Sequence, residues 1–279
     1  MRGDADMLKV EGLHIALGGF ALQASSDVEA GQRVAVIGPS GAGKSTLLGA
    51  IGGYIPSKGR IDVGGKDVSH ANPDKRGIAM LFQDGNLFPH LTLAQNVGLG
   101  LRPSLRLSDA EGARVSEALD RVGLAAFKAR KPGDVSGGQQ SRAALARVLV
   151  QGKPLLLLDG PFAALGLALR AELLDLTSDV AGDTGATVLM ITHAPEDAER
   201  AADQVIFVDE GRVEPPQPVS EIMSNPPPAL RAYLGRCAQG APCFKDAKCR
   251  LRSLAPFGDE VVGIDRLVVL CLLELMWRQ

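Results

Sequence analysis

The chain has 279 residues and a formal net charge of −2, and 46% of its residues are hydrophobic whereas only 4% are aromatic. This length allows one large domain or two small ones with a full hydrophobic core. The nearly balanced charge offers no basic footprint, so we expect no nucleic-acid partner. No apolar run is long enough to cross a bilayer, and residues 1–6 lack the apolar segment of a secretory signal, so we expect a cytoplasmic protein.

Regular structure is expected to begin at Met7, after a short extension of residues 1–6, and either Met1 or Met7 suits the true start. From Met7 to about Gly235, strand-like and helix-like runs alternate with short turns, which predicts an α/β architecture. Short apolar runs predict strands at residues 34–37, 78–82, 155–158, 187–191 and 204–208. A tight hairpin turn is expected over 209–213, and apolar residues spaced four apart predict a helix over 138–151.

An inserted helical subdomain is expected between two strands of the core, because about residues 91–135 are helical in character. The composition then changes after Gly235. Residues 236–279 form an atypical tail that holds all four cysteines and the single tryptophan. A cytosolic setting and the lack of Cys-x-x-Cys spacing favour unconnected thiols over disulfides or zinc. The apolar run 267–273 is open to three interpretations: a partner helix, an interfacial patch or an unevolved extension, which we favour.

The most informative segment is a glycine-rich stretch after the strand-like run 34–37. It consists of Gly38, Pro39, Ser40, Gly41, Ala42, Gly43, Lys44, Ser45 and Thr46. Glycines let successive backbone N–H groups turn inward around a phosphate, and the start of the following helix favours the anion further. Lys44 supplies a positive charge for the outer phosphates, and the Ser45 hydroxyl can ligate Mg²⁺. The alternative is a glycine-rich turn that merely precedes a lysine, but the strand–loop–helix context favours a P-loop that binds ATP.

A carboxylate at the end of a neighbouring strand is the second element that such a site needs, because it holds Mg²⁺ directly or through water. Asp159 directly follows the apolar run 155–158. An apolar strand that ends in aspartate is common and mostly structural when it occurs alone. Combined with the P-loop, it predicts the metal-binding carboxylate.

A capping sequence precedes this strand. Its residues are Ser136, Gly137, Gly138 and Gln139. A serine before two glycines at a helix start can cap the helix and aim free N–H groups at an anion. By itself the sequence predicts only a good N-cap.

Together these segments resemble the ATP-binding cassette (ABC) proteins. The Ser136 segment resembles the signature motif of that family, Gln83 resembles its Q-loop and His193 its switch histidine. The motifs occur in the family's order between Met7 and about Gly235. The resemblance implies a P-loop NTPase fold of the ABC type with an inserted helical subdomain. It also implies ATP and Mg²⁺ as cofactors, catalytic roles for Gln83 and His193, and contact of Gln83 with Mg²⁺ or the attacking water.

Within the family, residues 80–83 and 86–101 resemble the cassettes of bacterial thiamine importers, as do residues 7–9 and 162–165. Cassettes of sulfate, molybdate, phosphate or polyamine importers share the nucleotide motifs but usually carry other residues after the Q-loop. The expectation of thiamine rests on resemblance alone, because no residue can be argued to touch thiamine.

The resemblance also implies partners. In ABC cassettes each ATP lies between the P-loop of one chain and the signature of another, so a second copy is expected to form a homodimer. Ser136 and Gly138 would then contact the γ-phosphate held by the partner copy's P-loop lysine. Membrane permease subunits, and through them a periplasmic solute-binding protein, are the further partners implied. The cassette would be peripheral, on the cytoplasmic face of the inner membrane.

Three positions depart from the family pattern. Gly160 stands where a glutamate normally orients or activates the attacking water. Losing a general base typically slows a reaction about 10²–10⁴-fold, so we expect ATP binding with weak hydrolysis. Gly166 replaces the D-loop aspartate, and Leu17 replaces the aromatic residue that stacks on adenine, with Phe20 as the nearest ring.

Several alternatives stay open at this point. Asp84 or His193 could partly substitute for the missing glutamate, although nothing in the sequence places them. Instead of an active ATPase, the chain could be a non-hydrolysing module that locks a closed dimer. The departures at these positions could also reflect a sequence error or a decayed gene copy. A soluble cassette protein acting on ribosomes or in DNA repair is disfavoured by the single cassette and the missing basic patch.

Overall fold

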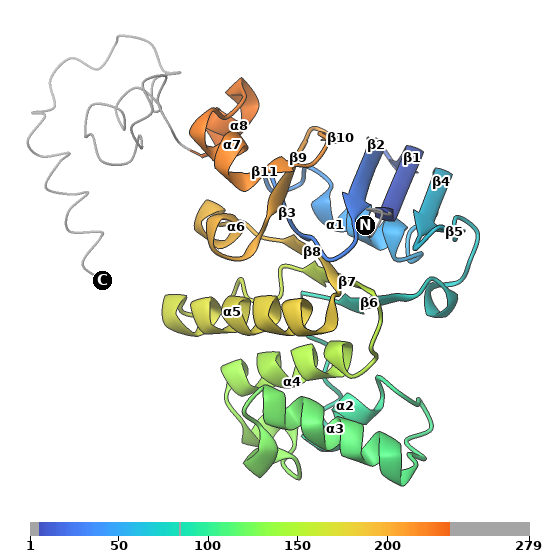
Figure 1. The fold of residues 1–279 in the computed structure, drawn as a ribbon, viewed down its shortest axis with the longest axis vertical. Coiled ribbons are helices and arrows are strands. Elements are labelled where there is room, and N and C mark those ends of the chain that lie inside the picture. Colours follow the sequence, from blue (N-terminus) through green and yellow to red (C-terminus); the bar gives the residue numbers. More distant parts are fainter. Residues whose placement is uncertain (1–5, 84, 235–279) are drawn as a thin grey trace, which may run out of the picture. The chain divides into compact units, whose positions relative to one another are not determined.

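The computed structural model describes residues 6–83 and 85–234 (Figure 1). The described residues up to Tyr233 form one compact unit. The expectations for Asp84, for nearly all of the N-terminal extension and for the tail 236–279 with its four cysteines lie outside the described residues.

Five parallel strands form the centre of the sheet, in the order β6-β7-β8-β3-β9. They are β3 (Arg33–Ile37), β6 (Ile78–Leu81), β7 (Leu155–Asp159), β8 (Thr187–Ile191) and β9 (Gln204–Asp209). Nearly all of their residues are buried, as expected for parallel strands covered on both faces. All five predicted strands are confirmed, with boundaries within one residue.

A second, mainly antiparallel group of strands extends this sheet and was not predicted from the sequence. It consists of β1 (Asp6–Leu17), β2 (Phe20–Glu29), β4 (Lys58–Val63) and β5 (Lys66–Asp67). Strand β10 (Arg212–Val213) pairs with both β2 and β9 and so joins the two groups, while β11 (Gln217–Pro218) pairs with β9. In Figure 1 β1, β2 and β4 lie beside helix α1.

The predicted hairpin turn over 209–213 is confirmed. Asp209 pairs with Arg212 in an antiparallel register, which leaves a two-residue turn. Both turn residues have positive φ, 44° at Glu210 and 76° at Gly211, which matches the twist of the flanking strands. The Gly211 N–H donates to the carbonyl of Ala42 at 3.2 Å, so this turn also supports the P-loop.

Helices cover the two faces of the parallel strands. Helix α1 (Lys44–Ile51) packs on one face, in a cluster with Leu155 and Leu157. Leu156 and Leu158, which point the other way along the same strand, pack with helices of the opposite face. Those helices are α4 (Gly137–Leu149), α5 (Leu167–Thr184) and α6 (Pro195–Ala201). Helix α4 confirms the helix predicted over 138–151.

A helical layer follows β6 in the chain. It contains α2 (Leu93–Gly98), α3 (Asp109–Arg121) and the 3₁₀ turns η2 (Ala125–Phe127) and η3 (Pro132–Asp134). Thr92 and Ser108 cap the two α-helices through reciprocal capping boxes with Gln95 and Glu111. Helices α2, α3 and α4 share an apolar cluster of their own. Figure 1 shows this layer beyond α5, away from the antiparallel strands.

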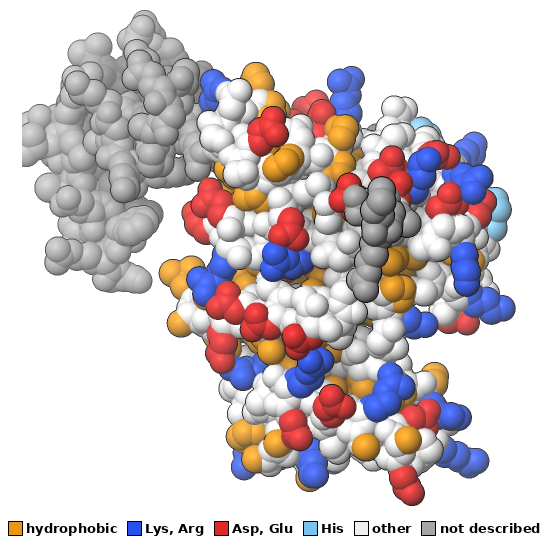
Figure 2. All heavy atoms as spheres, viewed as in Figure 1, with side chains coloured by type: hydrophobic (Ala, Val, Ile, Leu, Met, Phe, Trp, Pro, Cys, Tyr) orange, Lys and Arg blue, Asp and Glu red, His pale blue; other side chains and the backbone are white. Residues whose placement is uncertain are grey.

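Three short elements of the described chain remain. They are η1 (Pro73–Lys75), α7 (Val219–Ser224) and α8 (Pro228–Tyr233). Figure 2 shows basic and acidic side chains interspersed over the visible face of the molecule. Among the residues that the structure describes, no helix is long and apolar enough to cross a membrane.

Candidate nucleotide-binding site

The P-loop connects the end of β3 to the start of α1. Gly43, the N-cap residue of α1, has a φ of 107°, a conformation that L side chains rarely adopt. A Cβ there would also come within 2.6 Å of Cζ of Phe20, so the ring of Phe20 lies directly against the loop. Leu17, the residue at the expected adenine-stacking position, pairs with Phe20 across the β1–β2 turn and is 44% exposed.

Lys44 is folded back onto the loop that carries it. Its ammonium group donates to the carbonyls of Gly38 and Pro39, both at 2.8 Å, and only 5% of the residue is exposed. Burial lowers the pKa of Lys44, and the negative charge of Asp159 opposes this shift. The ammonium group is thus held at the loop by two neutral carbonyls. A bound phosphate could replace them as its partner, because a charged acceptor binds an ammonium group more strongly.

Ser45 and Asp159 come together as the sequence predicts. The Ser45 hydroxyl donates to Oδ1 of Asp159 at 2.9 Å, which joins the start of α1 to the end of β7. Burial raises the pKa of Asp159, while the hydrogen bond from Ser45 and the charges of His193 and Lys44 oppose the rise.

This pair of oxygen donors fits Mg²⁺. Magnesium prefers oxygen ligands, and usually takes one or two carboxylates together with substrate phosphates and water. A dedicated cage of three or more His, Cys, Asp or Glu side chains does not occur among the described residues. Ser45 and Asp159 supply two oxygen ligands, which suits a metal that completes its coordination with nucleotide phosphates and water.

Gly160 follows Asp159 directly and has a φ of 53°. A Cβ at this position would meet Cγ and Cδ of Gln83 at 3.9 and 4.0 Å, which are ordinary contact distances. Gln83 therefore lies beside Gly160. There is room for a side chain at 160, but the left-handed backbone disfavours one.

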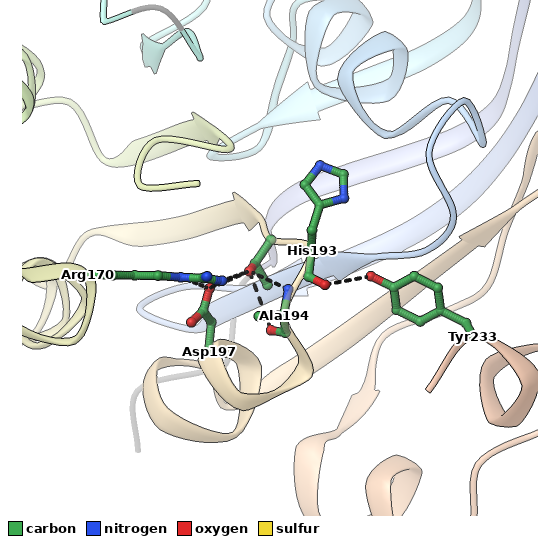
Figure 3. A network of polar contacts seen from close by, with 6 residues as sticks. Arg170, His193, Ala194, Asp197 and Tyr233 are labelled. Carbon is green, nitrogen blue, oxygen red and sulfur yellow. Dashed lines mark hydrogen bonds and ion pairs between the residues drawn. The ribbon is translucent and has the colours of Figure 1, made fainter. Parts of the chain in front are cut away.

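His193 lies between two anchored residues at the end of β8 (Figure 3). The hydroxyl of Thr192 donates to the Asp197 carboxylate and accepts from the N–H of Ala194 at 3.1 Å. Arg170 from α5 reaches the same carboxylate, with Nε at 2.9 Å. This network is largely buried, so the backbone on both sides of His193 is fixed.

The imidazole of His193 is exposed and lies within electrostatic reach of the P-loop. Partial burial lowers the pKa of His193, the charge of Lys44 lowers it further and Asp159 raises it. The charges of Lys44, Asp159 and His193 influence one another's pKa values in the region around the Ser45–Asp159 hydrogen bond. A cavity of about 130 Å³ adjoins it, lined among others by Gly160, Arg170 and His193.

The predicted signature segment caps α4. Ser136 accepts from the N–H of Gln139 at 3.3 Å, and Gln139 accepts from the N–H of Ser136 at 2.9 Å. Within this segment, Ser136, Gly138 and Gln139 line a hollow of about 230 Å³, and Arg142 lines it too. Because α4 and α1 pack on opposite faces of the parallel strands, and no hydrogen bond among the described residues joins the two segments, the structure does not bring Ser136 to this chain's own P-loop.

Several residues around the site were missed from the sequence. Arg170, Asp197 and Tyr233 carry no motif, although the Tyr233 hydroxyl donates to the carbonyl of His193 at 3.0 Å. Gly166 caps α5 without a side-chain hydrogen bond, and Leu167 next to it is 84% exposed.

A phosphate-binding loop between a buried parallel strand and a helix, with a serine and an aspartate meeting beside it, defines a nucleotide-binding protein of the P-loop class. The sequence profile of the ABC transporter family matches residues 22–163. The chain belongs to the ABC transporter family.

Relatives at high identity narrow this assignment. The thiamine import ATP-binding protein of Cereibacter sphaeroides is 57% identical over 230 residues, which cover 82% of this chain and all of that protein. The protein of the same name from a Ruegeria species is 55% identical with the same coverage.

A solved structure supports the same family. A dimeric ATP-binding cassette in a post-hydrolysis state, bound to ADP and Pi, is 30% identical and superposes with a TM-score of 0.66. The match covers 76% of this chain and 99% of that one. A nucleotide-free cassette from an ABC transporter, 21% identical with a TM-score of 0.73 and covering 83% and 100% of the two chains, shows the shared fold.

Proposed function

We propose that this chain is the ATP-binding, energy-coupling subunit of a bacterial importer for thiamine. The single observation that carries the proposal is the identity of 57% to a thiamine import ATP-binding protein over that protein's full length. The partners we propose are a second copy of the chain, membrane permease subunits and, through them, a periplasmic solute-binding protein. The subunit would be peripheral, on the cytoplasmic face of the inner membrane.

Within this chain, we assign the cassette to residues 7–235, with a helical subdomain at about 91–135 and a separate tail at 236–279. The ATP phosphates would lie in the loop from Gly38 to Thr46. Lys44 would leave the carbonyls of Gly38 and Pro39 and bind the outer phosphates, because a phosphate is a stronger acceptor than a neutral carbonyl.

Ser45 and Asp159, with Gln83 beside them, would hold Mg²⁺. When bound, the metal supplies neutralisation of the negative charge that develops on the phosphates. Gln83 and His193 would orient the attacking water and the terminal phosphate. Phe20, whose ring lies against Gly43, is positioned to contact the nucleotide in place of the aromatic residue that Leu17 replaces.

A second copy would complete each site. Ser136, Gly137, Gly138 and Gln139 cap a helix that packs on the opposite face of the sheet from α1, which supports a role toward another chain's nucleotide. The start of a helix offers free N–H groups to an anion. A solved ATP-binding cassette that is 30% identical to this chain is a dimer, which supports a site shared between two copies.

Hydrolysis is expected to be slow in this chain, because Gly160 has no group that can accept a proton. Phosphoryl transfer depends chiefly on positioning and charge neutralisation, so the remaining residues can sustain a reduced rate. A second candidate function follows from the same observation. The chain could act as an ATP-binding module that locks a closed dimer without hydrolysing the nucleotide.

Uptake of radiolabelled thiamine tests the import function. The chain would be produced in a bacterium that lacks its own thiamine-importer cassette but keeps the permease and the binding protein. We expect uptake above that given by a Lys44→Ala control, and more uptake with Gly160→Glu. Absence of uptake with all three chains would refute thiamine import by this cassette.

The dimer is tested separately, with the purified chain and light scattering during size-exclusion chromatography. A mass that doubles on addition of ATP and Mg²⁺ supports the shared site. If the dimer forms and persists until nucleotide is removed, with no phosphate released, the locking module is favoured over the ATPase. A monomer under all conditions would contradict both functions.

A further inference from the structure

Tyr233, the last residue of helix α8, reaches from the edge of the unit to the candidate nucleotide site (Figure 3). Its hydroxyl donates to the backbone carbonyl of His193 at 3.0 Å. The ring of Tyr233 is half-buried and lies 6.3 Å from the ring of Phe207 on β9, centroid to centroid. The sequence separation of forty residues means that this contact joins the final helix to the loop after β8.

The same phenol also lies beside the beginning of the P-loop. Burial raises the pKa of Tyr233, and a polar contact with the backbone N–H of Gly38 opposes the rise. Gly38 itself is pressed against β9, because a Cβ there would come within 2.0 Å of the Val208 carbonyl oxygen. The Tyr233 hydroxyl therefore binds the histidine of one loop of the site, and the backbone of Gly38, the first residue of the other loop, lies close enough to influence the pKa of Tyr233.

We propose, building on the function given above, that Tyr233 is a positioning residue of the nucleotide site. Its hydroxyl holds the His193 peptide in place, so that the imidazole stays directed at the terminal phosphate. Thr192 and Ala194 are fixed on the far side by Arg170 and Asp197. Tyr233 binds the backbone carbonyl of His193 in the same turn.

The role follows from how the loop is built. The side chain of His193 is exposed, so its direction depends on the peptide that carries it. Reactions of this kind lose rate when a reacting group shifts by about an ångström, even if binding is unchanged. Loss of one hydrogen bond to that peptide should therefore slow phosphoryl transfer, whereas the contacts of ATP with the P-loop should persist.

Tyr233→Phe tests the proposal, because it removes the hydroxyl and keeps the ring against Phe207. Tyr54→Phe is the matched control: it is the other tyrosine of the chain, it is 53% exposed, and its hydroxyl has no hydrogen-bond partner among the described residues. Single-turnover hydrolysis of γ-labelled ATP would be measured with enzyme in excess, which detects slow rates. Affinity for a fluorescent ATP analogue and the melting temperature would be measured in parallel.

The expected result for Tyr233→Phe is a single-turnover rate roughly three- to tenfold lower, with nucleotide affinity and melting temperature unchanged. Tyr54→Phe should match the wild type in all three. An unchanged rate for Tyr233→Phe, or a loss of affinity and stability equal to the loss of rate, would overturn the positioning role.

Two further results separate this proposal from the proposed function. If the wild-type chain binds no nucleotide, that result refutes the proposed function itself, and the role of Tyr233 falls with it. If it binds nucleotide but releases no phosphate, hydrogen exchange of residues 190–198 in the ATP-bound chain decides. Faster exchange in Tyr233→Phe than in Tyr54→Phe supports the role of Tyr233, and equal exchange overturns it.

Discussion

The hydroxyl of Ser45 and the carboxylate of Asp159 are 2.9 Å apart, although 114 residues separate them in the chain. Ser45 lies in the first turn of α1 and Asp159 ends β7, which is not the strand that leads into the P-loop. The parallel order β7-β8-β3 brings the carboxyl ends of these strands to one edge, where both oxygens point to the same place. That edge is where open α/β sheets bind their ligands.

Asp159→Asn removes the negative charge of the Asp159 side chain and keeps the size of that side chain. We expect the affinity for ATP in the presence of Mg²⁺ to fall roughly 10–100-fold, because a charge-assisted contact to the metal is lost. Isothermal titration calorimetry with and without EDTA measures the effect. With EDTA present the two chains should differ little, and an equal loss of affinity in both conditions would show that Asp159 does not act through a metal.

Gly160→Glu should restore a carboxylate to the site. We expect ATP turnover to rise by about 10²-fold or more, the usual contribution of a general base. The left-handed φ of 53° should cost about 1–2 kcal/mol of stability.

Gly160→Ala is the matched control for Gly160→Glu, because it introduces the same strain without a carboxylate. It should lower the melting temperature to a similar extent and leave turnover unchanged. Equal turnover of the wild-type and Gly160→Glu chains would contradict the importance assigned to this position.

Asp197→Asn tests the buried network beneath His193. Arg170 and Asp197 have side chains only 16% and 12% exposed, so removal of one charge leaves the other buried without its partner. We expect the free energy of unfolding to fall by about 3 kcal/mol, measured by urea denaturation. Asp175→Asn, which breaks the exposed pair with Arg200, is the comparison and should change stability little. Similar losses in the two variants would argue against a special role for the buried pair.

The cap of helix α3 gives a prediction of pH dependence. Hydrogen bonding from the Ser108 backbone, followed by that from Arg102, lowers the pKa of Glu111 from 4.5 to about 2. A lowered pKa in the folded state means stabilisation that is fully present above pH 4.5 and is lost as the pH falls through about 2.

Glu111→Gln keeps the capping geometry and removes the charge, so it isolates this effect. It should melt at a lower temperature than the wild type at pH 7, and the gap should close between pH 4.5 and pH 2. Melting curves by circular dichroism at several pH values test this. A gap that does not vary with pH would contradict the assignment.

The parallel core and the nucleotide motifs could be predicted from the sequence, because both depend on local patterns. Buried parallel strands such as β8 appear as short apolar runs between turn residues. The P-loop has its chemistry within nine consecutive residues, and Asp159 follows the clearest apolar run in the chain. These features need no knowledge of distant contacts.

The rest depends on pairings over long sequence distances. Strands β1, β2 and β4 alternate polar and apolar residues, and their register is set by each other. The contact of Tyr233 with His193 and the Arg170–Asp197 pair arise only when helices pack on the folded sheet. The left-handed backbone at Gly160 also has no signature in the sequence.

Equilibrium binding of labelled ATP to the purified full-length chain, compared with Lys44→Ala, tests the central claim most directly. The account predicts saturable binding that requires Mg²⁺ and weakens roughly 10–100-fold in Lys44→Ala, with the fold of the variant intact by circular dichroism. No saturable binding by the folded wild-type chain, or equal affinity of the two chains, would contradict it.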